Sequence, residues 1–388
     1  MARPRHQAIL RKEIPAGPRR GQEGVTATKI AKLKTRILEL PYRKPLITAT
    51  NRFSKAQGIL VEAVSEDGLT GFGYADLFPR TGETTGSALY AVEKIIAPAV
   101  EGRDIADIGK IKGEIDRLMI GNPRVKSAVD TALHDLLARQ LKVPLCLLLG
   151  GAVKAEVRII RFVGLAEPEA MAEDARQLVA LGFTALKLKI NGNVKLDTAR
   201  VAKVREAVRG EIFIKVDANE AYDTKSALRM AGKLADFNVA ILEQPVPRAQ
   251  IQALKEIKLK SPIQIEGDQS ANSVAEAYRL IKQGAVDSIN TSIQKAGGFS
   301  EARRIAELCA LGGIACHLSN TAGSMVGDAA ALHLAASCAS ISPLCELGEF
   351  ETIDNDPFQG LSVRDGAVSL SEEPGLGVAP IQVGKDEG

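Results

Sequence analysis

The chain has 388 residues, of which 45% are apolar and 25% charged, which is typical of a globular protein with a large core and room for a second domain. It has no apolar run of the roughly 18 to 20 residues needed to cross a bilayer, so a membrane protein is not expected. Its five cysteines form no CxxC pair, which argues against a disulfide or zinc framework and favours a reducing cytoplasm.

The N-terminal segment, residues 1–24, is basic and rich in Pro and Gly, and it lacks the apolar core of a secretory signal. It holds six Lys or Arg and two acidic residues, whereas residues 25–388 hold 44 basic and 45 acidic residues. A nucleic-acid or membrane role could therefore rest only on this tail, which lacks aromatic interleaving and amphipathic order. We expect a disordered tail and neither kind of partner.

Residues 25–150 predict a small α+β domain. Short β-rich runs come first, and SEDG within GILVEAVSEDGLTGFGYA reads as a hairpin turn. Helical patterns follow and end in SAVDTALHDLLARQLKVPLCLLLGG.

Residues 151–345 change to strands that alternate with amphipathic helices. The predicted strand ends fall 28, 26, 25, 24 and 25 residues apart, at Lys189, Asp217, Glu243, Asp268, Ser292 and His317. This regular step favours a (β/α) barrel. A doubly wound sheet would carry a glycine-rich turn after its first strand, which RIIRFVGLAEPEA lacks. Residues 346–388 return to short strands and are expected to pack back on the N-terminal domain.

Three carboxylates end three consecutive predicted strands, namely Asp217, Glu243 and Asp268. The carboxyl ends of parallel strands meet at one mouth of a barrel, so these side chains are expected to converge. Oxygen ligands of this kind suit Mg²⁺, with Mn²⁺ as an alternative. One Asp alone at such a position would more often be a helix N-cap, but three together favour a divalent metal site.

Two lysines share one face of the strand in FTALKLKINGN, because Lys187 and Lys189 lie two residues apart. Like charges lower the pKa of an amine, so Lys189 is expected to act as a general base on a substrate carboxylate chelated to the metal. The alternative is an interdomain salt-bridge pair, which does not account for two lysines on one face of an apolar strand.

Together these motifs resemble the enolase superfamily and, more narrowly, its muconate lactonizing enzyme subgroup. The matching residues are Lys187-x-Lys189, Asp217-x-Asn219, Glu243-Gln244-Pro245 and Asp268-Gln269-Ser270. The resemblance covers about residues 27 to 380. It implies a capping domain over a modified (β/α)7β TIM-type barrel, and a homo-oligomer. It also implies that Asp217, Glu243 and Asp268 bind the metal, Lys189 is the acid/base, and Lys187 contacts the substrate carboxylate.

Two positions depart from the subgroup's pattern. Gln269 is neutral where the subgroup has Glu, and Ser292 stands where it has a lysine on the opposite face of the substrate. Lys295 lies three residues further along and matches a different lysine of the family, while His317 is the histidine available at the next strand end. Ser292 is expected to be a hydrogen-bonding group, with His317 or Lys295 as the substitute acid.

The departures guide the predicted reaction. Racemisation needs an acid/base on each face, whereas elimination needs one strong base. We therefore expect a dehydratase of a β-hydroxy acid or hydroxy amino acid, with a hydroxyproline-type dehydratase as one instance. The alternatives are an amino-acid or dipeptide racemase or epimerase, a cycloisomerase, and, in another class, a non-catalytic binding barrel.

Substrate recognition is expected in two places. The segment 42–58 corresponds to a loop that closes over substrate in the family, and it offers Arg43, Lys44, Thr50 and Arg52. The eighth strand end offers Glu346, Glu349 and Glu351 for a substrate ammonium. The sequence does not choose among them.

Overall fold

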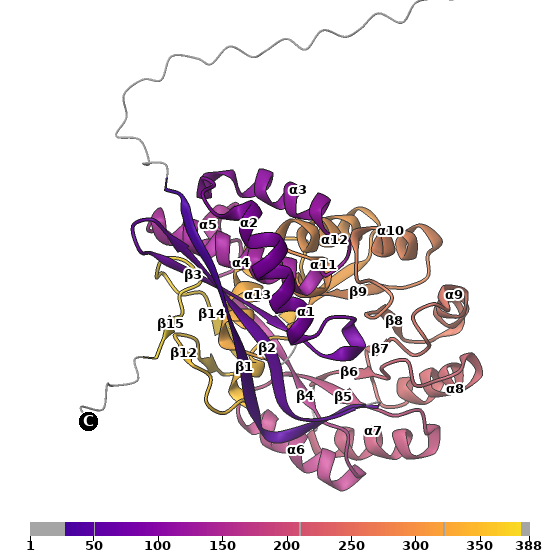
Figure 1. Ribbon diagram of the computed structural model, residues 1–388. Coiled ribbons are helices and arrows are strands. Elements are labelled where there is room, and N and C mark those ends of the chain that lie inside the picture. Colours follow the sequence, from indigo (N-terminus) through magenta and orange to yellow (C-terminus); the bar gives the residue numbers. More distant parts are fainter. Residues whose placement is uncertain (1–27, 50, 209–210, 321–322, 382–388) are drawn as a thin grey trace, which may run out of the picture.

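The computed structural model describes residues 28–49, 51–208, 211–320 and 323–381. A small α+β domain covers one end of a barrel (Figure 1). The predicted tail, residues 1–24, and the predicted substrate-binding Thr50 lie outside the described residues.

The capping domain begins with an antiparallel sheet of order β1-β2-β3, formed by Ile30–Ile47, Arg52–Ser65 and Thr70–Asp76. The predicted SEDG hairpin is the turn between β2 and β3. The helices that follow are η1 (Pro79–Thr81), α1 (Thr85–Tyr90), η2 (Ala91–Ile96), α2 (Ala97–Val100), η3 (Ile105–Asp107), α3 (Ile108–Leu118), α4 (Pro123–Gln140) and α5 (Leu145–Leu148).

Both faces of this sheet are buried, because successive residues of a strand point to opposite faces. On β2, Ile59 and Val61 pack with the capping helices, while Leu60 between them packs in the core shared with the barrel. Two glycines bring α4 directly onto β3, since a Cβ on Gly71 or Gly73 would lie 2.3 Å or 1.9 Å from a backbone oxygen of that helix. The capping domain is thus fixed to the barrel by a continuous core.

The second part is a closed barrel of eight parallel strands, as predicted. The strands are β4 (Glu156–Val163), β5 (Ala185–Lys189), β6 (Phe213–Asp217), β7 (Ile241–Glu243), β8 (Gln264–Gly267), β9 (Ser288–Thr291), β10 (Ala315–Leu318) and β11 (Leu344–Cys345). Each pairs with the next, β11 pairs with β4, and a bridge between Ser319 and Glu346 closes the ring.

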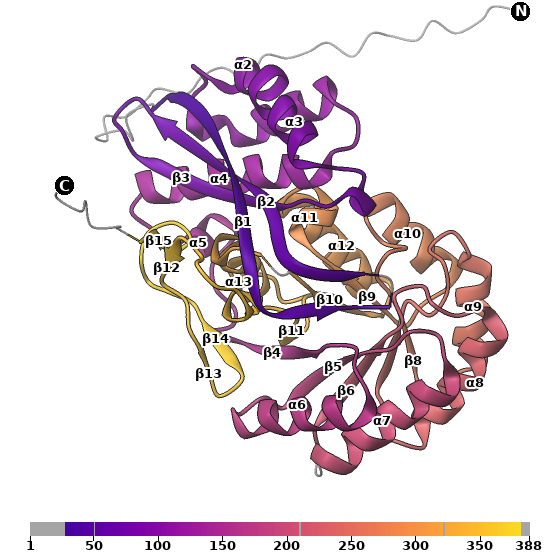
Figure 2. The same cartoon turned by 60° about the horizontal axis from the view of Figure 1, so that its bottom comes forward.

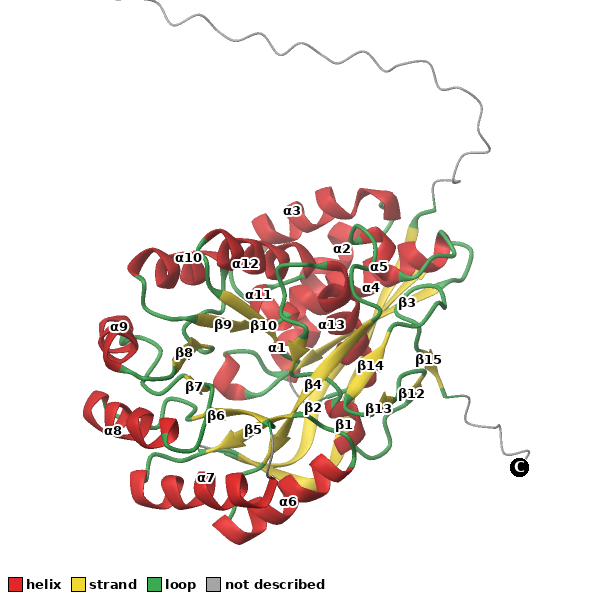
Figure 3. Ribbon diagram, turned by 180° about the vertical axis from the view of Figure 1, so that it is seen from behind, coloured by secondary structure: helices red, strands yellow, loops and turns green. Residues whose placement is uncertain are grey.

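Helices lie outside the strands (Figure 3). They are α6 (Pro168–Ala180), α7 (Val194–Val208), α8 (Thr224–Ala235), α9 (Ile251–Lys260), α10 (Val274–Gln283), α11 (Ile293–Ala296), α12 (Phe299–Leu311) and α13 (Met325–Ser337). All thirteen residues of α13 are buried, because this helix packs against both β3 of the capping domain and β4 of the barrel. No helix in the described part of the chain is long and apolar enough to cross a membrane.

The C-terminal segment contains η4 (Glu349–Thr352), β12 (Phe358–Gln359), β13 (Val363–Arg364), β14 (Ala367–Ser369) and β15 (Ala379–Pro380). It contacts the capping domain, where the backbone N–H of Leu376 donates to Asp135 Oδ1 at 2.7 Å. It also extends the barrel sheet, because β14 pairs antiparallel with β4.

The far end of the β1–β2 hairpin lies across the barrel (Figure 2). There the backbone N–H of Leu165, after β4, donates to the carbonyl of Ile47 at 3.0 Å, and Lys44 donates to Asp174 of α6 at 3.2 Å. These contacts hold the described residues of segment 42–58 over the carboxyl ends of the barrel strands.

Candidate active site

A cavity of about 600 Å³ lies between the capping domain and the barrel mouth. Its capping side includes the apolar side chains of Leu46, Phe53 and Phe78, and its barrel side includes Lys189, Asp217 and Asp268. Charged groups at strand ends, facing a wall of mixed apolar and charged side chains, are the pattern of a site that holds a small polar substrate.

The three predicted metal ligands end β6 and β7 and follow β8. Asp217 Oδ2 accepts from Lys189 Nζ at 2.6 Å, Glu243 accepts from Lys187 Nζ at 2.9 Å, and Asp268 Oδ1 pairs with Lys295 Nζ. Because β6, β7 and β8 are neighbours in the barrel, their carboxylates occupy one arc of the mouth.

These carboxylates fit a divalent cation. Burial and the Asp217 carboxylate raise the pKa of Glu243 to about 8, against the opposing effect of Lys187 and Lys215. Burial and Asp217 therefore disfavour the ionised form of Glu243 more than Lys187 and Lys215 favour it. A bound divalent cation would favour the ionised form of Glu243, and ionised carboxylates are the hard oxygen donors that Mg²⁺ or Mn²⁺ prefers.

The two lysines of β5 differ in their partners. Lys187 Nζ lies within 3.2 Å of carboxylate oxygens of Asp217, Glu243 and Glu346, so its three N–H donors are all occupied. Lys189 Nζ has one carboxylate partner, Asp217. Lys189 is therefore the lysine with hydrogen-bonding capacity left for a substrate.

Lys187, which was predicted to contact the substrate carboxylate, has a strongly shifted pKa. Burial alone would lower its pKa, but the carboxylates of Asp217, Glu243 and Glu346 outweigh it and hold the pKa well above the ordinary value. The lysine neighbour in the sequence is a smaller influence than three carboxylates brought from other strands. Lys187 is a permanent cation in this structure.

The barrel interior contains a charged cluster that the sequence analysis missed. The three carboxylates of Glu243, Glu266 and Glu346 offer oxygens within 4.8 Å of one another. Lys215 Nζ bonds to all three, at 2.8 Å from Glu243 and 2.6 Å from Glu346. A signal was available, because Lys215 and Glu266 each precede a predicted ligand by two residues and so share its inward face.

His317 lies in this interior cluster. Its Nδ1 pairs with Glu266 Oε2, which also accepts from Ser288 Oγ at 2.8 Å, and His317 is not among the residues that line the cavity. A proton from His317 would have to pass through other side chains to reach a substrate there.

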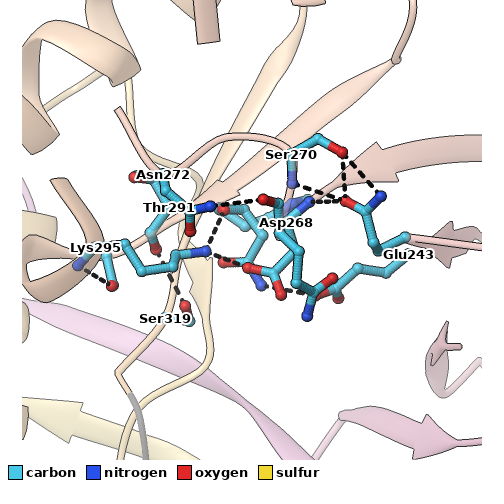
Figure 4. A network of polar contacts seen from close by, with 12 residues as sticks. Glu243, Asp268, Ser270, Asn272, Thr291, Lys295 and Ser319 are labelled. Atoms are coloured by element: carbon cyan, nitrogen blue, oxygen red, sulfur yellow. Dashed lines mark hydrogen bonds and ion pairs between the residues drawn. The ribbon is translucent and has the colours of Figure 1, made fainter. Parts of the chain in front are cut away.

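Ser292 and Lys295 both line the cavity. Ser292 Oγ accepts from the backbone N–H of Lys295 at 3.0 Å and so caps α11, in keeping with the neutral hydrogen-bonding group that was expected. Lys295 extends toward Asp268 (Figure 4) and also donates to the carbonyl of Asn290 at 2.9 Å. Its amine therefore lies at the ends of β8 and β9.

The predicted neighbours of the ligands shape the loops around them. Asn219 donates to both oxygens of Asp217. Gln244 Oε1 accepts the backbone N–H groups of Asp268 and Ser270 at 3.0 and 3.1 Å. Gln269 lines the cavity.

The predicted substrate-binding residues have varied surroundings. Arg52 lines the cavity, whereas Arg43 pairs at the surface with Asp354 at 3.1 Å. Glu346 binds Lys187 and Lys215, and Glu349 lies 3.5 Å from Arg161. A substrate ammonium at either glutamate would compete with cations of the protein.

Known proteins share this two-domain architecture. Residues 32–150 match the mandelate racemase/muconate lactonizing enzyme N-terminal domain, and residues 170–382 match the enolase C-terminal domain-like family. The chain is 33% identical to the hydrophobic dipeptide epimerase of Enterococcus faecalis, over 89% of this chain and 96% of that one. It is 32% identical to muconate cycloisomerase 1 of Rhodococcus opacus, over 91% and 96%.

A solved structure of the Enterococcus faecalis dipeptide epimerase, complexed with Mg and the dipeptide L-Leu-L-Tyr, superposes with a TM-score of 0.87 at 32% identity and covers 90% of this chain and 99% of that one. These relatives are isomerases. This supports the racemase, epimerase or cycloisomerase predicted as alternatives from the sequence, rather than the predicted dehydratase. The predicted fold and the enzymatic nature of the protein are confirmed. The chain belongs to the enolase superfamily, in its mandelate racemase and muconate lactonizing enzyme group.

Proposed function

We propose that the protein is an Mg²⁺-dependent epimerase that inverts the α-carbon of an amide-linked amino acid bearing a free carboxylate. The observation that carries this proposal is the environment of Lys189. Its amine has one carboxylate partner, and it lines the same cavity as Asp217 and Asp268. Support for the substrate class comes from the dipeptide epimerase at 33% identity. The capping side of the cavity offers both apolar side chains, such as Leu46 and Phe53, and charged ones, such as Arg52.

Asp217, Glu243 and Asp268 would hold the divalent cation. When bound, such a cation stabilises the negative charge that develops on a substrate carboxylate after loss of the α-proton. Lys187, a permanent cation with three carboxylate partners, fixes the orientation of Asp217 and Glu243. Lys189, in its neutral form, takes the α-proton on one face of the substrate.

Lys295 is the group we assign to the other face. In the barrel order, β5 and β9 are separated by β6, β7 and β8, so in a ring of eight they lie on opposite sides of the mouth. Lys295 Nζ has two acceptors, Asp268 and Asn290, and an ammonium has three donors. The third N–H of Lys295 can deliver the proton that completes inversion. Proton exchange with solvent then returns Lys189 to its neutral form and Lys295 to its protonated form.

The test is proton NMR in D₂O with Mg²⁺, starting separately from L-Ala-L-Phe and L-Ala-D-Phe. We expect deuterium at the α-carbon of Phe together with the opposite epimer, and loss of activity after EDTA. Lys189→Ala should lower interconversion by roughly 10²–10⁴-fold, the usual contribution of a general base. Lys295→Arg preserves the charge beside Asp268 but cannot release its proton near neutral pH, so it should also lose interconversion.

A second candidate, cycloisomerisation, is favoured by one observation. Ser292 stands where the subgroup has a lysine on the opposite face of the substrate. If Lys295 does not act, Lys189 is the single base, and a single base is sufficient for cycloisomerisation. The 32% identity to a muconate cycloisomerase gives this reading similar support. Conversion of cis,cis-muconate to a lactone, with no epimer formed from either dipeptide, would replace epimerisation by cycloisomerisation.

A further inference from the structure

Gln294 joins the short helix that carries Lys295 to the capping domain. Its side chain is buried, and it is not among the residues that line the cavity. Its Oε1 accepts the backbone N–H of Asp76, the last residue of β3, at 2.9 Å and Nη1 of Arg124, in the first turn of α4, at 3.2 Å. Both donors belong to the capping domain, so one side-chain oxygen of the barrel binds two elements of that domain.

The amide nitrogen of Gln294 continues this contact into the barrel. Its Nε2 donates to Asn320 Oδ1 at 3.1 Å, and Asn320 Nδ2 donates to Asp328 Oδ1 at 3.2 Å. Asp328, in the first turn of α13, also accepts the backbone N–H groups of Gly348 and Phe350, which follow β11, at 3.1 and 3.0 Å. Gln294 therefore belongs to a buried network that runs from the capping domain to the loop after β11.

Helix α11 depends on such contacts for its orientation. It has only four residues, and a helix of this length is not stable by itself. Its apolar residues Ile293 and Ala296 pack in the core, but apolar burial is non-directional. Among the described residues, the side-chain hydrogen bonds between α11 and the capping domain are those of Gln294. Directional contacts therefore hold α11 through Gln294 on one side and through Lys295 on the other.

We propose that Gln294 is a positioning residue that ties the orientation of Lys295 to the capping domain. This rests on the proposed function, in which Lys295 delivers the proton to one face of the substrate. Successive residues of a helix point roughly 100° apart, so Gln294 binds the capping domain while Lys295 extends toward Asp268 in the barrel mouth. Proton transfer needs hydrogen-bond reach, so a rotation of α11 would move the amine of Lys295 away from the α-carbon.

The test follows deuterium exchange at the α-carbon of Phe in D₂O with Mg²⁺, starting separately from L-Ala-L-Phe and L-Ala-D-Phe. Each epimer presents its α-proton to a different lysine, so the loss of exchange in Lys295→Arg identifies the epimer that faces Lys295. Gln294→Met keeps the length of the side chain but loses both of its hydrogen-bonding atoms. It should slow exchange from that epimer by about tenfold or more. Exchange from the other epimer should be little changed, because Lys189 stays in place on β5.

Two further variants separate positioning from a general loss of stability, with the ratio of the two exchange rates as the readout. Gln294→Glu keeps oxygens that accept from the two donors of the capping domain, so its ratio should lie closer to that of the wild type than the ratio of Gln294→Met does. Tyr222→Phe removes a different buried hydrogen bond, from Tyr222 Oη to Asp197 at 2.6 Å, and should leave the ratio unchanged.

A second measurement reports on the helix without any substrate. The backbone N–H groups of Gly297 and Gly298 both donate to the carbonyl of Ile293 at 3.0 Å. Hydrogen–deuterium exchange of these amides, measured by mass spectrometry on the full chain with Mg²⁺, shows whether α11 is held in place. We expect faster amide exchange in Gln294→Met than in the wild type, with the amides of α8 unchanged.

The proposal is overturned if Gln294→Met slows α-carbon exchange from both epimers equally or from neither, or if the amides at the end of α11 keep their wild-type protection. It is also overturned if Lys295→Arg leaves exchange from both epimers intact, because Lys295 would then not be the second acid/base. Failure of the proposed function is seen separately, as the absence of α-carbon exchange from either dipeptide with the wild-type protein. The amide exchange would still show in that case whether Gln294 holds α11.

Discussion

Lys215 has surroundings unlike those of a usual lysine. Its side chain is fully buried and its ammonium lies among Glu243, Glu266 and Glu346. The carboxylates outweigh the burial that would lower its pKa, so the pKa is raised well above the ordinary value. This ammonium takes the central position that a metal ion would occupy among three such carboxylates, and it belongs to the scaffold beneath the reacting groups.

Replacing Lys215 by Met should therefore lower the free energy of unfolding by about 3–5 kcal/mol, because three buried carboxylates lose their common partner. Urea denaturation followed by circular dichroism measures the change. Lys225→Met, the same substitution at an exposed position of α8, should change stability by less than about 0.5 kcal/mol. Equal effects of the two substitutions would mean that the Lys215 cluster contributes little to the stability of the barrel.

The sequence revealed the residues at strand ends but not the environment of each. Asp217, Glu243 and Asp268 were found because the βα repeat places strand ends at a regular step along the chain. The raised pKa of Lys187 was not predicted, because its neighbour Lys189 is visible two residues away while its three carboxylate partners lie 30 to 159 residues away. Electrostatics depends on cross-strand neighbours, which the shear of the barrel sets and the sequence does not state.

At the scale of elements, the contact between α4 and β3 depends on two missing side chains. Gly71 and Gly73 lie on the same face of β3, and α4 carries Arg124 at its start. The motif GFG was part of a predicted hairpin, but the sequence alone does not say that a helix 50 residues later would pack against it. The two glycines therefore set how closely α4 packs on β3, and with it the position of Arg124, which lines the cavity.

Gly73→Ala should destabilise the protein by about 1–3 kcal/mol, the usual cost of overpacking, because the new Cβ would lie 1.9 Å from the carbonyl oxygen of Ala128. The matched control is Gly232→Ala within α8, where a Cβ meets nothing within 4 Å. That change should stabilise the protein by about 0.5–1 kcal/mol through the higher helix propensity of Ala. Thermal unfolding of both variants tests the argument, and a stable Gly73→Ala protein would contradict it.

At the scale of the whole molecule, the two domains share one hydrophobic core, and α13 runs through it. Residues of β1, β2 and β3 pack in the same cluster as the barrel strands and α13. Leu60 of the capping sheet and Leu332 of α13 belong to that cluster. The β1–β2 hairpin is thus built on the same core as the metal-ligand strands, so the cavity between them has walls of fixed relative position.

His333 of α13 makes the stability of this core depend on pH. It is 1% exposed, and its Nδ1 accepts the backbone N–H of Cys146 at 3.0 Å. Burial lowers its pKa from 6.5 to about 4, with the Leu376 backbone opposing. Between these values the unfolded chain binds a proton that the folded protein excludes, so stability is full above pH 6.5 and falls as the pH decreases toward 4.

The shift of 2.5 pH units corresponds to about 3 kcal/mol of stability lost across this window, at about 1.4 kcal/mol per unit. His333→Asn keeps an acceptor for Cys146 but cannot gain the proton, so its unfolding free energy should fall by about 3 kcal/mol less than that of the wild type between pH 6.5 and 4. Denaturation at half-unit steps of pH measures both curves. Acidic groups elsewhere titrate in both proteins and cancel in the difference, so parallel curves would mean that His333 is already protonated, or exposed to water, in the folded protein.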